Sequence, residues 1–108
     1  MLSEAVLEKY YQQIAEKLDE IIPVDWDRIV MYAEDVDEVS SVCFYYYTND
    51  YTKVHHWGDI PEEYGINKTI FNSLIRELRI INSNLRMEFK NAGETPWCTL
   101  TFYLEKDW

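Results

Sequence analysis

The chain has 108 residues, 47% of them apolar and 28% charged, which is the balance of one compact domain and excludes a disordered segment. Its formal net charge of −10 disfavours direct binding to the phosphates of nucleic acids. We expect a single domain over residues 1–108 in the cytoplasm, because neither a signal peptide nor a membrane span is recognisable.

The negative charge is concentrated in the first part of the chain. Up to Gly65, 15 acidic residues stand against 4 basic ones, whereas from Ile66 onward 5 acidic residues stand against 6 basic ones. An acidic surface of this kind attracts basic proteins, although keeping a protein in solution is the more general role of surface acids.

The first expected element is an amphipathic helix. Ser3 is suited to cap its N-terminus, with Glu4 in the first turn, and Pro23 marks its end. Its apolar residues recur at spacings of three and four, namely Val6, Tyr10, Ile14, Leu18, Ile21 and Ile22. The remaining side of this helix is polar and is expected to face solvent.

Three strands are expected next, at Ile29–Ala33, Val39–Thr48 and Tyr51–Trp57. They are rich in Val, Ile, Tyr and Phe, and are separated by Asp35-Val36-Asp37-Glu38 and by Asn49-Asp50. Asn and Asp tolerate positive φ better than most residues, so Asn49-Asp50 predicts a two-residue hairpin. The pattern as a whole predicts a three-stranded antiparallel meander.

The middle strand has two apolar faces. Alternation places Val42, Phe44 and Tyr46 on one face, and Cys43, Tyr45 and Tyr47 on the other. One face is expected to pack on helices, which leaves the other available to another molecule.

The second half of the chain predicts a loop and a long helix. Gly and Pro indicate a loop over Gly58–Gly65, Asn67 is suited to cap the helix, and Gly93 follows its expected end near Asn91. The apolar residues at helical spacing are Phe71, Leu74, Leu78, Ile81, Leu85 and Phe89.

A last strand is expected at Trp97–Leu104, where apolar and polar residues alternate after Pro96. The fold class is therefore α+β. An antiparallel sheet of about four strands, three in a meander plus the C-terminal strand, packs against the N-terminal helix and the long second helix.

We expect no catalytic site, metal site or cofactor. His55 and His56 are neighbours on a predicted strand and point to opposite faces, so they are poorly placed to share a ligand. The three glycines are too far apart for a phosphate-binding loop, and the carboxylate pairs lack the pattern of a calcium loop. Cys43 and Cys98 are expected to be reduced thiols in strands, with a disulfide or a reactive thiol as alternatives.

A surface that binds another protein is the remaining hypothesis. Tyr and Trp are frequent interface anchors, and aromatic rings surrounded by carboxylates suit a basic partner. The candidate partner-binding residues are Asp25, Asp27, Glu34, Asp35, Asp37, Glu38, Tyr45, Tyr47, Trp57, Asp59, Glu62 and Glu63.

Six motifs follow one another along the chain. They are Ile14-Ala15; Ile22-Pro23-Val24-Asp25-Trp26; Phe44-Tyr45-Tyr46; Asp59-Ile60-Pro61-Glu62-Glu63-Tyr64; the helical Leu74, Leu78, Leu85 and Phe89; and Pro96-Trp97-Cys98-Thr99. In this order and spacing they resemble the YezG-like family of bacterial immunity proteins, over nearly the whole chain. Members of the family usually continue beyond the strand after Pro-Trp, so the resemblance implies a short or truncated member whose last strand is an open edge.

The resemblance implies an antitoxin that binds and neutralises the C-terminal domain of a cognate toxin, of the polymorphic, LXG or type VII-secreted kind. Such a toxin domain is often a nuclease, and the acidic residues of this chain would then stand where its basic groove holds phosphates. No enzymatic activity, direct nucleic-acid contact or membrane contact is implied. The alternatives are a non-catalytic homo-oligomeric module that uses the aromatic strand face or the open edge, for example as a homodimer, and, third, an enzyme.

Overall fold

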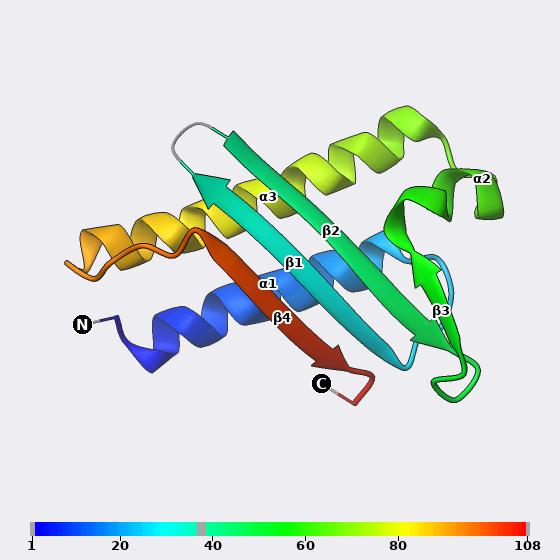
Figure 1. Ribbon diagram of the computed structural model, residues 1–108, viewed down its shortest axis with the longest axis horizontal. Coiled ribbons are helices and arrows are strands. Elements are labelled where there is room, and N and C mark those ends of the chain that lie inside the picture. Colours follow the sequence, from blue (N-terminus) through cyan, green and yellow to red (C-terminus); the bar gives the residue numbers. More distant parts are fainter. Residues whose placement is uncertain (1, 37–38, 108) are drawn as a thin grey trace.

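The computed structural model describes residues 2–36 and 39–107. Its elements follow in the order α1 (Glu4–Ile21), β1 (Arg28–Val36), β2 (Val39–Thr48), β3 (Lys53–His56), the 3-10 turn η1 (Trp57–Asp59), α2 (Ile60–Tyr64), α3 (Lys68–Asn91) and β4 (Thr99–Glu105). The described strands form one antiparallel sheet, and α1 and α3 lie behind it in the view of Figure 1. The predicted α+β class, with an N-terminal helix and a long later helix, is confirmed.

α1 forms where its cap and its apolar stripe predict it. The side chain of Ser3 accepts the backbone N–H of Val6 at 3.3 Å and so satisfies one of the free donors of the first turn. The helix ends at Ile21, just before Pro23, which cannot continue a helical hydrogen-bond ladder. Its buried residues are Tyr10, Ile14, Ala15, Leu18 and Ile21.

β1 lies inside the sheet, between β2 and the C-terminal strand β4. The strand order is β3-β2-β1-β4, so β1 pairs with its sequence neighbour β2 on one side and with the C-terminal strand β4 on the other. In this register Val30 lies opposite both Tyr45 and Tyr103, and Met31 lies opposite both Phe44 and Phe102. Successive residues point to opposite faces, so each such row lies on one face of the sheet.

The β2–β3 connection is longer than the sequence predicts. Thr48 pairs with Lys53, which leaves four residues in the turn and shortens the expected strand Tyr51–Trp57 to Lys53–His56. Three residues of the turn, Asn49, Asp50 and Tyr51, adopt positive φ. A two-residue hairpin was therefore the wrong prediction, because Tyr51 also leaves the strand and turns its ring toward β4, where its hydroxyl reaches Glu105.

The segment predicted as a loop over Gly58–Gly65 contains η1 and the short helix α2. Pro61 lies in the first turn of α2, where its missing N–H is not needed. Ile60 and Pro61 are buried, and Gly65 ends the helix with a φ of 66°. Glycine permits this left-handed conformation without the steric cost that a side chain brings.

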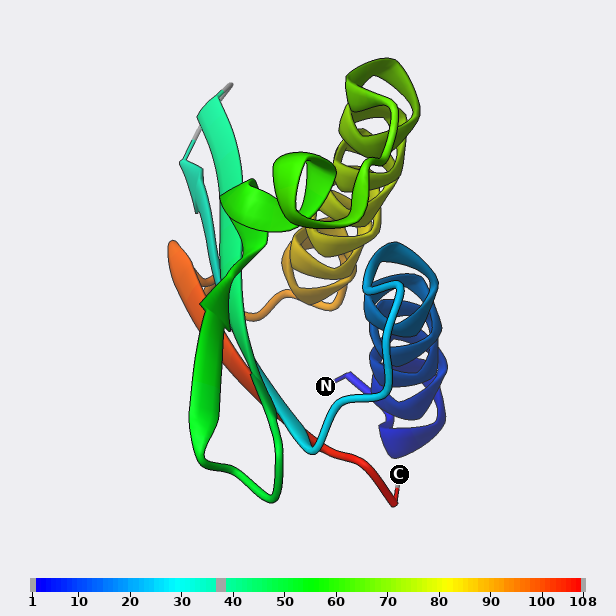
Figure 2. The same ribbon diagram turned by 90° about the vertical axis from the view of Figure 1, so that its right-hand side faces the viewer.

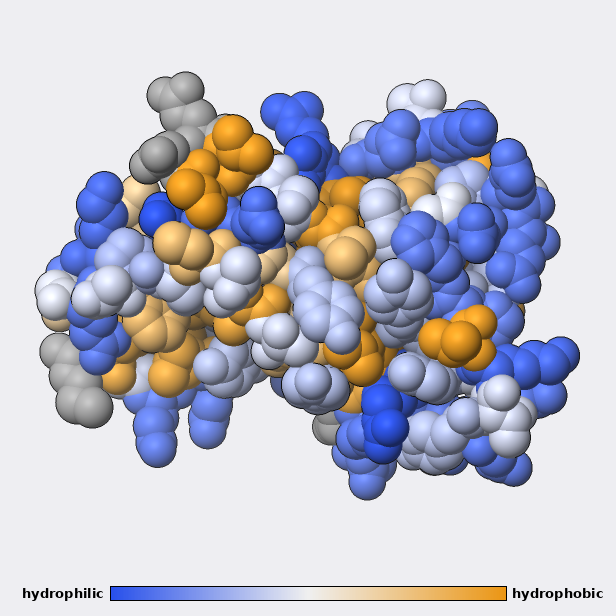
Figure 3. Space-filling model, in the orientation of Figure 1, coloured by the Kyte–Doolittle hydropathy of each residue, from blue (hydrophilic) through white to orange (hydrophobic). Residues whose placement is uncertain are grey.

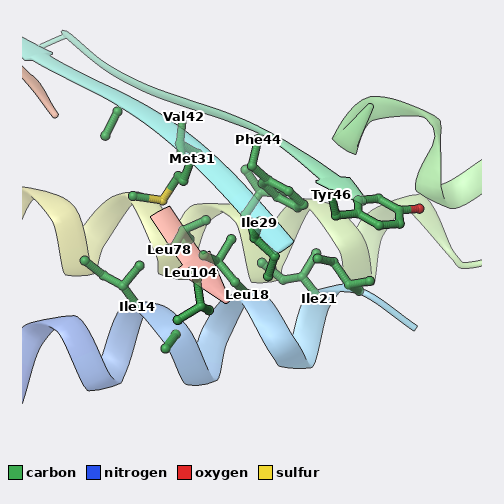
Figure 4. Packing of buried hydrophobic residues seen from close by; sticks show 14 of the residues in the cluster. Ile14, Leu18, Ile21, Ile29, Met31, Val42, Phe44, Tyr46, Leu78 and Leu104 are labelled. Atoms are coloured by element: carbon green, nitrogen blue, oxygen red, sulfur yellow. The ribbon is translucent and has the colours of Figure 1, made fainter. Parts of the chain in front are cut away.

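α3 is the longest helix and covers the middle of the sheet. Asn67 caps it as predicted, because its Oδ1 accepts the N–H groups of Thr69 and Ile70 at 2.8 and 3.1 Å. Figure 4 shows Leu78 of α3 packed with Ile14 and Leu18 of α1 and with strand residues that include Phe44. Among the described residues, no helix is long and apolar enough to cross a membrane.

Candidate functional site

The sheet has one covered face and one open face. Its covered face carries Ile29, Met31, Phe44 and Tyr46, which are all fully buried. In Figure 2 both long helices and α2 lie on this side of the sheet. Within residues 2–36 and 39–107, no helix lies over the opposite face. This open face is therefore the first candidate for contact with another molecule.

A row of aromatic side chains crosses the open face. The register places His56, Tyr45, Val30 and Tyr103 side by side, one from each strand. Tyr45 is 38% exposed and Tyr103 is 68% exposed, whereas Val30 between them is buried. Tyr32, which is also exposed, meets Tyr45 edge-on with 6.5 Å between the ring centroids. We call Tyr32, Tyr45 and Tyr103 the tyrosine face.

Exposed aliphatic side chains extend this surface along the strands. Val36, Val39 and Val54 are all exposed, and the register places them on the open side of β1, β2 and β3. In Figure 3, which views the open face, hydrophobic and pale surfaces lie over the strands, and the strongly hydrophilic colours gather toward the rim. An apolar centre with a polar rim is the usual anatomy of a protein–protein interface.

One end of the open face is occupied by a charge cluster. Arg28 Nε donates to Glu105 Oε1 at 2.5 Å, and the ring of Tyr51 lies over the guanidinium at 5.0 Å. The Tyr51 hydroxyl donates to Glu105 Oε2 at 3.1 Å. The hydrogen bond from Arg28 and, to a smaller extent, the one from Tyr51 lower the pKa of Glu105 below its ordinary value. Tyr47, which lies opposite Arg28 in the register, is only half-buried. This end of the face is balanced in charge.

The two predicted acids before β1 differ in their surroundings. Asp27 Oδ2 accepts the backbone N–H of Tyr51 at 3.1 Å, and its Oδ1 lies 3.3 Å from Lys106 Nζ. The backbone hydrogen bond and then Lys106 lower the pKa of Asp27. Asp27 therefore ties the turn to the end of β4, whereas Asp25 is exposed and lines a hollow with Asp19.

The predicted acids at the far end of β1 are divided by alternation. Glu34 is exposed on the open face, opposite Ser41 and Thr99. Asp35 points to the helix side and is only 7% exposed, because β1 continues to Val36 instead of ending at Ala33 as predicted. Asp37 and Glu38 lie outside the described residues.

A second group of predicted residues gathers around η1 and α2. Trp57 stacks on Phe71 with ring centroids 6.0 Å apart and therefore belongs to the helix side. Asp59, Glu62 and Glu63 are exposed beside it. The twelve candidates thus do not form one site, because the acids of α2 and Tyr45 lie on different sides of the sheet.

The two histidines point to opposite faces, as predicted. His55 stacks on Tyr46 with ring centroids 4.7 Å apart, and its Nε2 lies 2.8 Å from Thr48 Oγ1. His56 meets Tyr45 on the open face. In the part of the chain that the structure describes, no three His, Cys, Asp or Glu residues are grouped so that they could hold a metal ion.

Both cysteines are free thiols in the structure, but only Cys43 lies in a strand as predicted. Cys43 is half-buried on the open side of β2, and burial raises the pKa of its thiol. Cys98 is exposed just before β4 instead of lying in the strand.

Comparison with known proteins identifies the family. The chain matches the family described as "Immunity protein YezG-like" over residues 7–107. The chain belongs to the YezG-like family. It is 38% identical to Immunity protein YezG of Bacillus subtilis (strain 168), over 93% of this chain and 66% of that protein. It is 30% identical to Type VII secretion system protein EsaG of Staphylococcus aureus, over 94% of this chain and 63% of that protein.

The YezG-like chain thus spans less than two thirds of the length of these relatives. The same holds for Immunity protein YezG of Bacillus spizizenii, which is 31% identical over 89% of this chain and 60% of that protein. The matched region runs from within α1 to just past the end of β4, so it contains the whole sheet and both of its faces.

Two members of the tyrosine face were absent from the sequence-based candidates of this YezG-like chain. Tyr32 and Tyr103 belong to β1 and β4, and the register of these strands with β2 places both residues near Tyr45. Alternation was a usable signal for both, since each lies between residues that pack toward the helices. The pairing of β1 with β4 carries no local sequence signal.

Proposed function

We propose that this YezG-like chain is an antitoxin that binds and neutralises the C-terminal domain of a cognate secreted bacterial toxin. The proposed toxin domain is a nuclease, and the proposed place of action is the cytoplasm of the producing cell. Support comes from the family and from the names of relatives, of which two are immunity proteins and one is a type VII secretion system protein. The chain acts by stoichiometric binding and not by catalysis.

The tyrosine face is the observation that carries this proposal. Tyrosine combines a large apolar ring with a polar hydroxyl, and it loses little conformational freedom on binding. Tyr32, Tyr45 and Tyr103 are held by three different strands of a rigid sheet, so they are arranged before a partner arrives. Exposed apolar surface with a polar rim is typical of a site that binds another protein.

Charge supports a basic partner. The chain carries a net charge of −10, and Glu34 places one of its acids on the open face itself. A nuclease presents cations along the groove that holds its substrate, and the two fields attract each other. Steering of this kind raises association rates by roughly 10 to 10³ at low salt.

The test is to mix the purified chain with the C-terminal domain of the toxin encoded beside it. Binding is followed by titration calorimetry and toxin activity by degradation of plasmid DNA and total RNA. We expect a stoichiometric complex in which degradation stops. Y45A and Y103A should each weaken the complex about tenfold or more, which is about 1.4 kcal/mol, because each removes an exposed ring from the contact.

The control is I70A, which truncates a residue that is 60% exposed on α3, away from the tyrosine face. It should bind like the wild type. Thermal melting checks that all three variants are folded. Absence of any complex, with the toxin fully active, contradicts the proposed function. A complex that Y45A and Y103A leave unchanged moves the contact to another surface.

The second candidate is a homo-oligomeric module. The observation that favours it is the outer edge of β4, which pairs with no described strand. Sedimentation over a range of concentrations separates the candidates. A dimer that forms without toxin supports the module, and a chain that stays monomeric at high concentration removes it.

A further inference from the structure

The hydrogen-bond pattern of β4 shows which of its backbone groups are free. Asp35 N–H donates to the carbonyl of Cys98 at 2.9 Å, and Lys106 N–H donates to the carbonyl of Asp27 at 3.0 Å. Cys98 and Lys106 are both even-numbered, and in an antiparallel ladder every second residue bonds to the same neighbouring strand. The backbone N–H and C=O groups of the even-numbered residues of β4 therefore point toward β1. The N–H and C=O groups of Thr99, Thr101 and Tyr103 therefore point outward, where no described strand pairs with them.

A groove runs beside this free edge, between β4 and α1. Its middle is a hollow of about 330 Å³ with an apolar floor of Tyr11, Ala15, Phe102 and Leu104, and Glu8 and Gln12 of α1 line its side. The rings of Tyr11 and Phe102 lie 5.7 Å apart, and Tyr11 is 39% exposed. A second hollow of about 350 Å³ continues from Tyr11 toward the start of α1. The floor of the groove is apolar and accessible.

Acidic side chains stand at both ends of the groove. Glu4 and Glu8 line the hollow near the start of α1, and both are exposed. Glu8 also lines the side of the middle hollow. Asp19 and Asp25 line the hollow at the other end, which also contains Lys106. A second copy of this chain would bring the same acids against each other, so the groove suits an occupant with basic residues flanking an apolar centre.

We infer that the toxin domain of the proposed function adds a strand to the outer edge of β4. This inference rests on that function and names its mode of contact. The added strand accepts and donates backbone hydrogen bonds at Thr99, Thr101 and Tyr103. Alternate side chains of the strand are apolar and enter the groove onto Tyr11 and Phe102. Its flanking Lys or Arg residues lie near the acids of α1, and its other side chains extend the tyrosine face beside Tyr103.

The decisive variant is T101P, measured by titration with the same toxin domain. Proline removes the outward N–H of Thr101 and places its ring on the free edge, yet it breaks no hydrogen bond to β1, since that N–H does not face β1. We expect affinity to fall at least tenfold. The matched control is T101V, which keeps the N–H and the strand propensity and should bind like the wild type.

A second measurement does not depend on how T101P folds. Hydrogen exchange of the wild-type chain should slow at the amides of Thr101 and Tyr103 when the toxin domain is added, while the outer edge of β3 stays unchanged. T101P that melts like the wild type and binds equally well would overturn the inference and leave the proposed function standing. So would unchanged exchange at Thr101 in a wild-type complex.

Two further outcomes separate the inference from the function on which it rests. A wild-type chain that forms no complex contradicts the proposed function, and the inference falls with it. A dimer of the free chain that T101P dissociates assigns the edge to a second copy, and that result also overturns the inference. Slower association of E8K at low salt, with no such loss for E62K, supports a basic strand in the groove.

Discussion

Tyr51 joins three parts of the chain that are distant in sequence. Its backbone N–H donates to Asp27 before β1, its ring lies over Arg28, and its hydroxyl donates to Glu105 of β4. The positive φ of 67° at Tyr51 is what turns the residue toward these partners. A residue with this conformation costs strain, which the surrounding hydrogen bonds offset. Tyr51 therefore fixes the end of β4 to the β2–β3 turn.

This cluster predicts sensitivity to acid. The pKa values of Asp27 and Glu105 are lowered in the folded protein, from ordinary values of 3.8 and 4.5. A carboxyl with a lowered folded-state pKa stabilises the fold above its ordinary pKa, and that contribution is lost as pH falls through the lowered value. The melting temperature should therefore decrease as the pH falls below about 4.5. E105Q should flatten this decline, whereas E62Q, on an exposed residue of α2, should leave it unchanged.

Thermal melts followed by circular dichroism between about pH 3 and pH 7 measure this effect. If the melting temperatures of E105Q and the wild type decline equally at low pH, other carboxylates account for the acid sensitivity.

At the scale of an element, α3 carries one polar residue within its buried stripe. Asn82 is 3% exposed, its Nδ2 lies 3.8 Å from the sulfur of Met31, and its Oδ1 has no hydrogen-bond partner among the described residues. Sulfur is a weak acceptor, so the contact with Met31 offsets little of the free energy that is lost when the Asn82 amide leaves water.

N82L should stabilise the protein by about 1 kcal/mol, because leucine has the same branched shape and needs no hydrogen bond. N84L on the exposed side of α3 is the control, since it makes the same change in helix propensity without burial. Urea unfolding of both variants gives the free energies. A gain equal to that of N84L would trace the effect to propensity alone, and a loss would mean that leucine does not fit beside Met31.

The elements differ in how far their sequence predicts them. Caps and periodicity place both long helices, and β2 has the predicted bounds Val39–Thr48, because these signals are local. α2 was missed because Gly58, Pro61 and Gly65 indicate a loop as well as the ends of a short helix. For the site, alternation predicts that Tyr45 leaves the covered face, but only the tertiary pairing of β1 with β4 brings Tyr103 near it.

At the scale of the whole molecule, acids and rings are arranged differently from what the sequence suggests. The acids near Trp57 lie on the helix side of the sheet. Asp27 is paired with Lys106 within the fold, and Asp35 is buried. Reversing Asp35 would therefore disturb folding together with binding. Glu34 and Glu62 are better positions for testing charge, since both are exposed and lie on different sides of the sheet.

A comparison of the variants E34K and E62K tests where the toxin docks. Each variant changes the net charge by the same amount, so any difference between them reports position. Glu34 lies on the open face, and E34K should therefore slow association with the toxin domain about three- to tenfold at low salt, and clearly more than E62K. The difference should shrink as salt rises, because screening acts over roughly 10 Å at 0.1 M. Stopped-flow measurements at several salt concentrations give both rates. Equal effects of the two variants would mean that net charge alone steers the partners, and a larger effect of E62K would place the contact at α2.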